Sequence, residues 1–366
     1  MDNRIKKLAE ILVHYSVKVK KGQLVKIQGE TAGLPLMTAI YEEVIRVGAH
    51  PYAVIKVPQN EEILFKHGSK EQLEFISPML RLEINKMDCL FNVWASENTR
   101  YLAGVNPKRM AIQRKAHKPL MQRLFKRIGD RSLNWVGTQF PTLADAQEAD
   151  MSLSEYEDFV YSAGHVNDRD PVKHWKKMEK EQKRLVKILN RIDWLHIKAP
   201  GVDLKMRVKG RKWISCHGTE NFPDGEIFTG PIEDTAEGVI NFNYPAVYMG
   251  RRVENVRLEF KKGVVVAESA DKDQAFLTAL LNSDKQARRI GEIAIGTNYS
   301  ITRHTGNILF DEKIGGTCHL AVGASIPESG GVNKSSIHWD MVRNLKKGGE
   351  ILADGKIIYR NGKFTI

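Results

Sequence analysis

The sequence predicts an α/β protein of two domains, an N-terminal α/β domain with a mainly parallel sheet and a C-terminal β-rich domain. The chain has 366 residues, more than a single hydrophobic core usually serves. Its first half alternates strand-like and helix-like segments, a pattern typical of parallel sheets. Near residue 190 the pattern changes to short strands separated by Gly, Asn, Asp and Pro. We therefore expect domains at residues 1–190 and 191–366.

The expected N-terminal domain begins with an amphipathic helix over residues 4–15 and ends with a connector helix over 171–190. Between them, no strand is followed by a Gly-rich loop with Lys and Ser or Thr, so we do not predict nucleotide binding. The other elements expected here are strands at 23–28, 52–57, 89–95 and 133–136 and a helix at 34–47 that ends at a glycine.

The expected C-terminal domain consists mostly of strands, with one clear helix over residues 271–287. Its strands are expected at 194–198, 204–208, 212–217, 253–260, 264–268, 308–311, 318–322 and 337–342.

The composition is that of an ordinary globular protein, with 42% hydrophobic and 27% charged residues. The sequence has no run of about 18 or more uncharged apolar residues, the length that a membrane-spanning helix needs. The N-terminus leads directly into an amphipathic pattern and does not have the apolar core of a signal peptide. The three cysteines are far apart and show no paired zinc-ribbon or redox spacing, so we expect them to be buried small residues. Together these features predict a cytoplasmic protein without a membrane partner.

The formal charge of +12 raises the alternative of a protein that binds RNA or another polyanion. Much of the excess lies in two runs, residues 108–131 and 173–191. In the second run, apolar residues recur at roughly helical spacing and Lys or Arg fills many of the other positions. That pattern is typical of a solvated helix face, so we do not expect a nucleic-acid partner.

Two segments place histidines where they could bind a metal. In the sequence SSIHWD at 335–340, His338 and Asp340 are two residues apart and would point to the same face of a strand. His319 lies in the apolar segment CHLAVG at 318–323, which ends in small residues. A solitary histidine in such a segment is also typical of a hydrogen-bonded core residue, and His338 with Asp340 could form a buried ion pair.

Two glutamates lie among apolar residues and glycines. They are Glu226 in PDGEIFTGP at 223–231 and Glu292 in IGEIAI at 290–295. Burying a carboxylate costs free energy unless it is paired or bound to a cation, so a metal would explain both positions. The alternatives are an exposed turn residue for Glu226 and a solvent-facing strand residue for Glu292.

Taken in order, several segments resemble the thermophilic metalloaminopeptidases of the aminopeptidase T and aminopeptidase S type. The resemblance covers nearly the whole chain, and an ordered set of motifs is more specific than any one of them. The segments are FPTLA at 140–144, MSLSEYEDF at 151–159, NFPDGEIFTGP at 221–231, IGEI at 290–293, NILFDE at 307–312, CHLAVG at 318–323 and SIHWD at 336–340.

The resemblance implies a metal site in the C-terminal domain, peptide substrates and a homodimer. The site would hold two divalent ions, zinc or cobalt in the first place and manganese as a further option, which would activate a water for attack on the first peptide bond. Glu292 would also take part in catalysis. The implied metal ligands are Glu226, Glu292, His319, His338 and Asp340.

One position departs from the family pattern. The family has a functionally important tyrosine shortly after the histidine of the CHLAVG segment, and here the matching residue is Ile326. A replacement hydrogen bond could come from Tyr248, Tyr299 or His304, or Glu292 could act as a proton shuttle. The departure leaves open a divergent amidohydrolase that acts on another substrate.

Overall fold

The computed structural model describes residues 2–366 and divides into two compact units. Of the described residues, the first contains 2–172 and 218–222, and the second contains 173–217 and 223–366. The domain boundary at residue 190 stays a prediction. Most of the basic helix 171–189, which we expected at the end of the N-terminal domain, belongs to the second compact unit. The first unit has an all-parallel sheet and the second is built largely of antiparallel strands, so the predicted fold class is confirmed.

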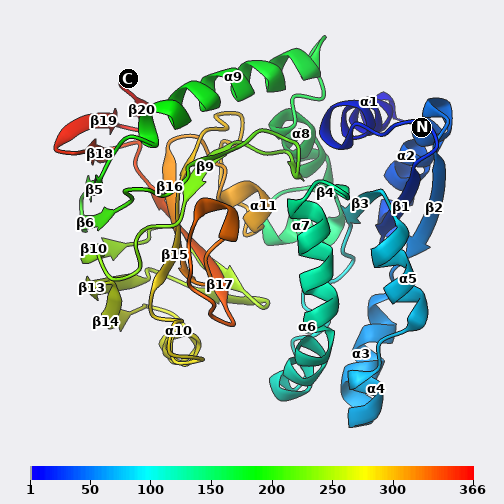
Figure 1. Ribbon diagram of the computed structural model, residues 1–366, viewed down its shortest axis with the longest axis horizontal. Coiled ribbons are helices and arrows are strands. Elements are labelled where there is room, and N and C mark those ends of the chain that lie inside the picture. The colour runs from blue at the N-terminus through cyan, green and yellow to red at the C-terminus, as the bar shows by residue number, and fades with distance from the viewer. Residues whose placement is uncertain (1) are drawn as a thin grey trace. The chain divides into compact units, whose positions relative to one another are not determined.

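The parallel sheet of the first unit has the strand order β2-β1-β3-β4-β8, and Figure 1 labels its first four strands. Val25 and Ile27 of the interior strand β1 are fully buried, as expected where helices cover a parallel sheet. The edge strand β8 comes from a distant part of the sequence and pairs with β4. The strands are β1 Leu24–Gly29, β2 His50–Ile55, β3 Cys89–Trp94, β4 Asn134–Gln139 and β8 Asn221–Phe222.

Most helices of the first unit begin at a residue whose side chain accepts a hydrogen bond from a backbone N–H of the first turn. Ser69 and Ser152 each form a reciprocal capping box with the residue three positions later. The expected glycine after α2 is Gly48, which ends the helix at φ +80°. The helices are α1 Asn3–Ile11 with a π-helical turn Leu12–Val17, a 3-10 turn Thr31–Gly33, α2 Leu34–Val47, α3 Pro58–His67, α4 Lys70–Glu74, α5 Pro78–Lys86, α6 Pro107–Gly129, α7 Leu143–Glu148 and α8 Leu153–Ala163.

The second unit contains an eight-stranded sheet, a five-stranded sheet and a two-stranded ribbon. The eight-stranded sheet has the order β14-β13-β10-β6-β5-β18-β19-β20, and the five-stranded sheet has the order β17-β16-β15-β9-β7. Its strands are β5 Trp194–Ala199, β6 Val202–Arg207, β7 Ile214–Cys216, β9 Glu226–Thr229, β10 Glu237–Asn241, β11 Ala246–Tyr248, β12 Arg251–Val253, β13 Arg257–Lys261, β14 Val264–Ser269, β15 Ile290–Gly296, β16 Thr317–Gly323, β17 His338–Asn344, β18 Glu350–Ala353, β19 Lys356–Arg360 and β20 Lys363–Phe364.

The core of the second unit includes side chains from both large sheets. Leu195 and Leu204 of the eight-stranded sheet belong to one buried cluster with Ile293, Leu320 and Trp339 of the five-stranded sheet. Ile293, Leu320 and Trp339 are each next in sequence to a predicted metal ligand on the same strand. Since strand side chains alternate between faces, the five-stranded sheet has one apolar core face and one face available for a site. Helices accompany these sheets: α9 Pro171–Leu189, α10 Gln274–Leu281, α11 Ile308–Asp311 and a 3-10 turn Pro327–Ser329.

Three predicted elements of the second unit differ from the structure. The strand predicted at 253–260 is divided between β12 and β13, the helix predicted at 271–287 is the shorter α10, and the strand predicted at 308–311 is absent. Residues 308–311 form the short helix α11, because the Asn307 side chain accepts a hydrogen bond from the backbone N–H of Leu309 and caps the turn. The strands β9 and β15, which carry two predicted ligands, were not expected as separate elements. Among residues 2–366, no helix is long and apolar enough to cross a membrane.

Candidate metal centre

The residues predicted to bind metal lie on four adjacent strands. Glu226 begins β9, Glu292 lies on β15 and His319 on β16, while His338 and Asp340 lie on β17. These strands are neighbours in the five-stranded sheet although the residues span more than 100 positions of the sequence. The fold therefore brings together all five side chains.

The strand register turns the ligands toward one face. Ala321 of β16 pairs with Glu292 on one side and with Asp340 on the other, and Gly323 pairs with His338. Directly paired residues of antiparallel strands point to the same face of a sheet. Because alanine and glycine occupy the middle positions, the longer acidic and imidazole side chains have room to converge above them.

The side chains meet at distances that suit shared cations. His319 Nε2 lies 3.3 Å from Glu226 Oε2 and 3.4 Å from Glu292 Oε1. His338 Nε2 lies 3.7 Å from Glu292 Oε2 and 3.4 Å from Asp340 Oδ2. Each imidazole thus has two carboxylates beside it, and Glu292 contributes one oxygen to each group.

The polar atoms of this cluster fit a divalent metal. Glu226 Oε2, His319 Nε2 and Asp340 Oδ1 are buried and make no hydrogen bond of good geometry, although Oε2 and Nε2 lie 3.3 Å from each other. Buried polar atoms in folded proteins are nearly always paired, so three unpaired atoms in one cluster require an explanation. Imidazole nitrogens and carboxylate oxygens are the donors that zinc and related divalent metals take, and a cation here would satisfy all three.

Backbone carbonyls orient both imidazoles. His319 Nδ1 lies 2.9 Å from the carbonyl oxygen of Glu312, and His338 Nδ1 lies 2.7 Å from that of Ala324. A carbonyl only accepts hydrogen bonds, so each Nδ1 must carry the proton that it donates. In the neutral ring, Nε2 then presents its lone pair to the carboxylates, which is the tautomer a metal ligand needs.

The carboxylates attract positive charge strongly. Burial alone would lower the pKa of His319, but Glu292 and Glu226 raise it to about 9. Burial likewise opposes the charge on His338, yet Asp340 and Glu292 raise its pKa to about 10. Protons therefore occupy both imidazoles at neutral pH, and a metal cation would compete with them for the same lone pairs.

A buried lysine adjoins the same cluster and was not singled out from the sequence. The Lys313 side chain has no exposed surface, and its Nζ lies 3.7 Å from Glu226 Oε1 and pairs with Glu312. Burial raises the pKa of Glu226 well above its ordinary value, and the ammonium of Lys313 is the main group that lowers it. Nothing in the residue pattern around Lys313 distinguishes it from a solvated lysine, so only the tertiary structure reveals it.

The two halves of the cluster differ in exposure. The His319 side chain is fully buried and that of Glu226 is 8% exposed, whereas His338 retains 30%. The His319 half is therefore closed to solvent and the His338 half is accessible.

Of the groups suggested as replacements for the family tyrosine, Glu292 belongs to this cluster, whereas the contacts described for Tyr299 and His304 lie outside it. The Tyr248 ring packs on Trp339, which points to the core face of β17. The Tyr299 hydroxyl donates to the carbonyl oxygen of Gly362, 2.8 Å away. His304 Nε2 lies 3.1 Å from Asp311 Oδ2.

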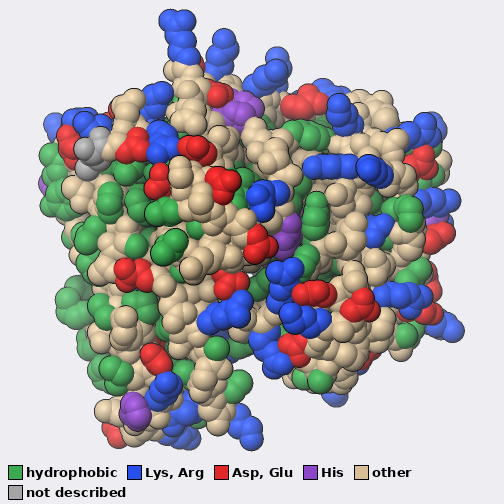
Figure 2. Space-filling model, turned by 180° about the vertical axis from the view of Figure 1, so that it is seen from behind, with side chains coloured by type: hydrophobic (Ala, Val, Ile, Leu, Met, Phe, Trp, Pro, Cys, Tyr) green, Lys and Arg blue, Asp and Glu red, His purple; other side chains and the backbone are tan. Residues whose placement is uncertain are grey.

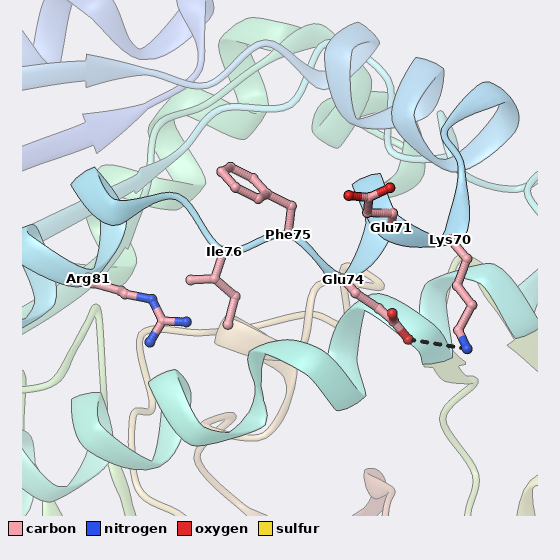
Figure 3. Close-up of a pocket in the computed structure, with 6 residues that line it drawn as sticks. All are labelled: Lys70, Glu71, Glu74, Phe75, Ile76 and Arg81. Atoms are coloured by element: carbon pink, nitrogen blue, oxygen red, sulfur yellow. Dashed lines mark ion pairs between the residues drawn. The ribbon is translucent and has the colours of Figure 1, made fainter.

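A separate hollow of about 690 Å³ lies on the first unit (Figure 3). It is open, and it is lined by the α4 residues Lys70, Glu71 and Glu74 together with Phe75, Ile76 and Arg81. None of these residues is a candidate metal ligand, so this hollow is not the metal centre.

Two imidazoles and three carboxylates buried in one cluster form a ligand set of the kind that metal-dependent hydrolases use. Comparison with known proteins agrees: the family described as thermophilic metalloprotease (M29) matches residues 1–364. The chain belongs to this family, and the predicted relationship to the thermophilic metalloaminopeptidases is confirmed.

Several characterised relatives are similar over their full length. The chain is 28% identical to Aminopeptidase 2 of Geobacillus stearothermophilus, over 100% of this chain and 98% of that protein. It is 26% identical to Aminopeptidase T of Thermus thermophilus, over 99% and 96% respectively. The solved structure of wild-type AmpT from Thermus thermophilus superimposes with a TM-score of 0.85 over 99% of both chains at 22% sequence identity, which shows the same fold.

Proposed function

We propose that the protein is a metal-dependent aminopeptidase that releases amino acids from the N-termini of peptides. The observation that carries the proposal is the group of three buried ligand atoms without a hydrogen bond, one each on Glu226, His319 and Asp340. Family membership supports metal-dependent peptide hydrolysis, and the names of the relatives support action at N-termini.

We propose two cations, and the arrangement of Glu292 is the main support. Its Oε1 lies beside His319 and its Oε2 beside His338, so Glu292 is the residue that would bridge two ions. Glu226 with His319 would complete one ligand group and His338 with Asp340 the other. These ion pairs divide the predicted ligands into two groups around Glu292, although ligand atoms of Asp340, Glu292 and His319 also lie within 4.8 Å of one another.

The charge balance also favours two divalent ions. Five carboxylates, those of Asp224, Glu226, Glu292, Glu312 and Asp340, act on Lys313 or His319 in this region, and Lys313 contributes one positive charge. The remainder is four negative charges, which is the charge that two divalent cations supply. A region this buried would be costly to leave uncompensated. Zinc or cobalt is the preferred identity, with manganese as a further option.

The reaction follows from what these residues can hold. When bound, two divalent ions polarise the scissile carbonyl and lower the pKa of a water toward neutrality. Each carboxylate oxygen has two lone pairs, so Glu292 can bind a cation and still accept a proton from a water beside it. We propose that Glu292 takes this proton and passes it to the leaving amine.

Access to the centre is from the side of His338, whose side chain is 30% exposed, because the His319 side is closed. A substrate approaching from that side reaches Glu292, His338 and Asp340, and a cation held by these residues would attract the lone pair of a free α-amine. We propose that this attraction selects the free N-terminus and makes the enzyme an exopeptidase.

A divergent amidohydrolase is a second candidate function. The observation that favours it is that Tyr299 and His304 are engaged elsewhere, so neither replaces the phenol missing at Ile326. A weaker hydrogen bond to the reacting oxygen would slow peptide hydrolysis relative to that of more activated amides.

Polyanion binding has less support. Basic residues of α9 pair with acidic neighbours, as Lys183 does with Glu179 and Arg184 with Glu181. Figure 2 shows Lys and Arg side chains dispersed over one face of the molecule and interspersed with Asp and Glu. We therefore do not propose a nucleic-acid partner.

We propose a homodimer, as the family resemblance implies. The support is a set of large apolar side chains on the neighbouring helices α5 and α6 and the residue after α4, since exposed apolar patches of this kind often mark protein interfaces. They are Phe75, Met79, Leu82, Met121 and Phe125, which are 40% to 65% exposed. Sedimentation equilibrium would test it: a monomer at micromolar concentration would exclude the dimer.

We propose a cytoplasmic location, because all three cysteines are free and two of them, Cys89 and Cys318, are buried.

The test of the proposed function is metal content together with hydrolysis of Leu-p-nitroanilide before and after chelation and metal add-back. We expect two ions per chain, and we expect chelation to abolish the hydrolysis of Leu-p-nitroanilide. His338→Ala should lower both, whereas the matched control His196→Ala, at an imidazole paired with Asp203 outside the cluster, should lower neither. Bound metal without hydrolysis of Leu-p-nitroanilide would favour the amidohydrolase. Absence of metal from both the purified and the reconstituted protein would refute the metal centre.

A further inference from the structure

Lys313 is fully buried, and its environment explains how an ammonium group is tolerated there. It follows α11 and precedes β16, and its Nζ pairs with the Glu312 carboxylate and lies 3.7 Å from Glu226 Oε1. A buried lysine without counter-charges would be strongly destabilising. Lys313 is therefore balanced by Glu312, its close partner, and by Glu226, which the proposed metal centre also uses.

The backbone fixes this loop against the ligand-bearing sheet. The N–H of Asn298 donates to the carbonyl oxygen of Lys313 at 3.0 Å. Gly296, at the end of β15, allows the approach, because a Cβ there would lie 2.1 Å from the carbonyl oxygen of Ile314. The position of Lys313 relative to Glu226, which pairs with Gly296 across the sheet, is thus set by main-chain contacts.

The two oxygens of Glu226 have different neighbours. Oε1 faces the ammonium of Lys313 at 3.7 Å, while Oε2 faces His319 Nε2 at 3.3 Å and makes no hydrogen bond of good geometry. Glu292 differs, because its two oxygens each face an imidazole. Glu226 therefore offers one oxygen to a cation, whereas Glu292 offers both.

We propose that Lys313 is a positioning residue that restricts Glu226 to binding metal through Oε2 alone and orients it toward His319. The proposal rests on the metal centre proposed above. Since groups that orient metal ligands typically affect metal affinity by about 10-fold to 100-fold, the loss of the ammonium should weaken the ion beside His319 by that factor. The ion beside His338 should be affected less, because Lys313 Nζ lies beside Glu226 and Glu312 and acts on Asp340 only through its charge.

The first test is a crystal structure of the wild-type protein loaded with Zn²⁺. We expect one oxygen of Glu226 at about 2.0–2.2 Å from the ion and the other still facing Lys313. Glu226 bound through both oxygens, or Lys313 turned away from it, would overturn the role of Lys313 and leave the metal centre intact. Failure of the wild-type protein to take up Zn²⁺ would instead refute the metal centre, and the role of Lys313 with it.

The second test compares Lys313→Met with Lys356→Met, a matched control on the exposed face of β19. Competition titration with a chelator and Co²⁺ measures both ions, and the visible spectrum of bound Co²⁺ reports the ligand geometry. We expect selective weakening of one ion by about 10-fold to 100-fold with an altered spectrum, and no change in the control. Equal weakening of both ions, tighter binding, or an unchanged spectrum and affinity would each contradict the proposal.

Discussion

The charge state of the two clustered imidazoles makes the stability of the metal-free protein depend on pH in an unusual direction. The pKa values of His319 and His338 are raised from 6.5 to about 9 and about 10 by the surrounding carboxylates. A group whose pKa is higher in the folded state binds its proton more tightly there. Its contribution to stability is complete below pH 6.5 and is lost as the pH rises through the folded-state value.

The magnitude follows from the shift. For His319, a change from 6.5 to about 9 corresponds to about 3 kcal/mol. His338 would contribute a similar amount between pH 6.5 and 9, but the two rings share Glu292 and their contributions will not simply add. We therefore expect the metal-free protein to lose at least about 3 kcal/mol of its free energy of unfolding between pH 6.5 and 9.

Other perturbed groups do not obscure this window. The pKa of Asp311 is raised by burial to about 7, so most of its contribution is lost before the imidazoles begin to titrate. The pKa of His304 is lowered by burial to about 4, so its effect appears only in acid. The raised pKa of Glu226 acts in the same direction as the imidazoles.

Urea unfolding in the presence of a chelator, at pH 6.5 and pH 9, measures the effect. Saturating metal should remove much of the decrease, because it replaces the two protons with cations. His338→Gln should reduce the pH dependence, and His196→Gln, outside the cluster, should not. A stability that is flat or rises between these pH values would show that the imidazoles are neutral in the metal-free protein and would refute the electrostatic reasoning.

Three further predictions concern the centre and the sheet that supports it. The Glu292→Gln variant should lose both ions, whereas the Glu226→Gln variant should lose mainly the ion beside His319. Elemental analysis distinguishes these outcomes, and loss of a single ion from the Glu292→Gln variant would rule out a bridging role for Glu292. Ile326→Tyr should raise kcat for Leu-p-nitroanilide by about tenfold or more if the family hydrogen bond is restored, and an unchanged kcat would show that another group already supplies it. Trp339→Ala should cost about 3–5 kcal/mol in denaturant unfolding, because this side chain is 1% exposed within the core of the second unit; a cost below about 1 kcal/mol would mean that the core repacks.

Local patterns predicted those elements whose residues alone define them. The helix at 34–47 was predicted with its terminal glycine, and the strand at 89–95 has a continuous apolar run. The strand predicted at 308–311 failed because its apolar residues resemble a strand, while a single side chain, Asn307, caps a helical turn there. The prediction therefore failed where one hydrogen bond outweighed the hydrophobic pattern.

The candidate ligands were predicted from two kinds of information. The alternation in SIHWD placed His338 and Asp340 on one face, and the register of β17 agrees. For Glu226 and Glu292, burial among glycines was only suggestive, and family resemblance was needed to include them. Lys313 was not predicted at all, because no sequence pattern distinguishes a buried lysine from a solvated one.

The sequence by itself determined the class of fold, the family and the five candidate ligands, because periodicity, capping residues and ordered motifs are local properties that a linear chain displays. Only the tertiary structure decided which oxygen of each glutamate faces which imidazole, and that Lys313 closes the group beside Glu226. These relations depend on the pairing of β9, β15, β16 and β17 across long sequence separations. Strand register and side-chain burial are products of the whole packed sheet, so they exist only once the chain has folded.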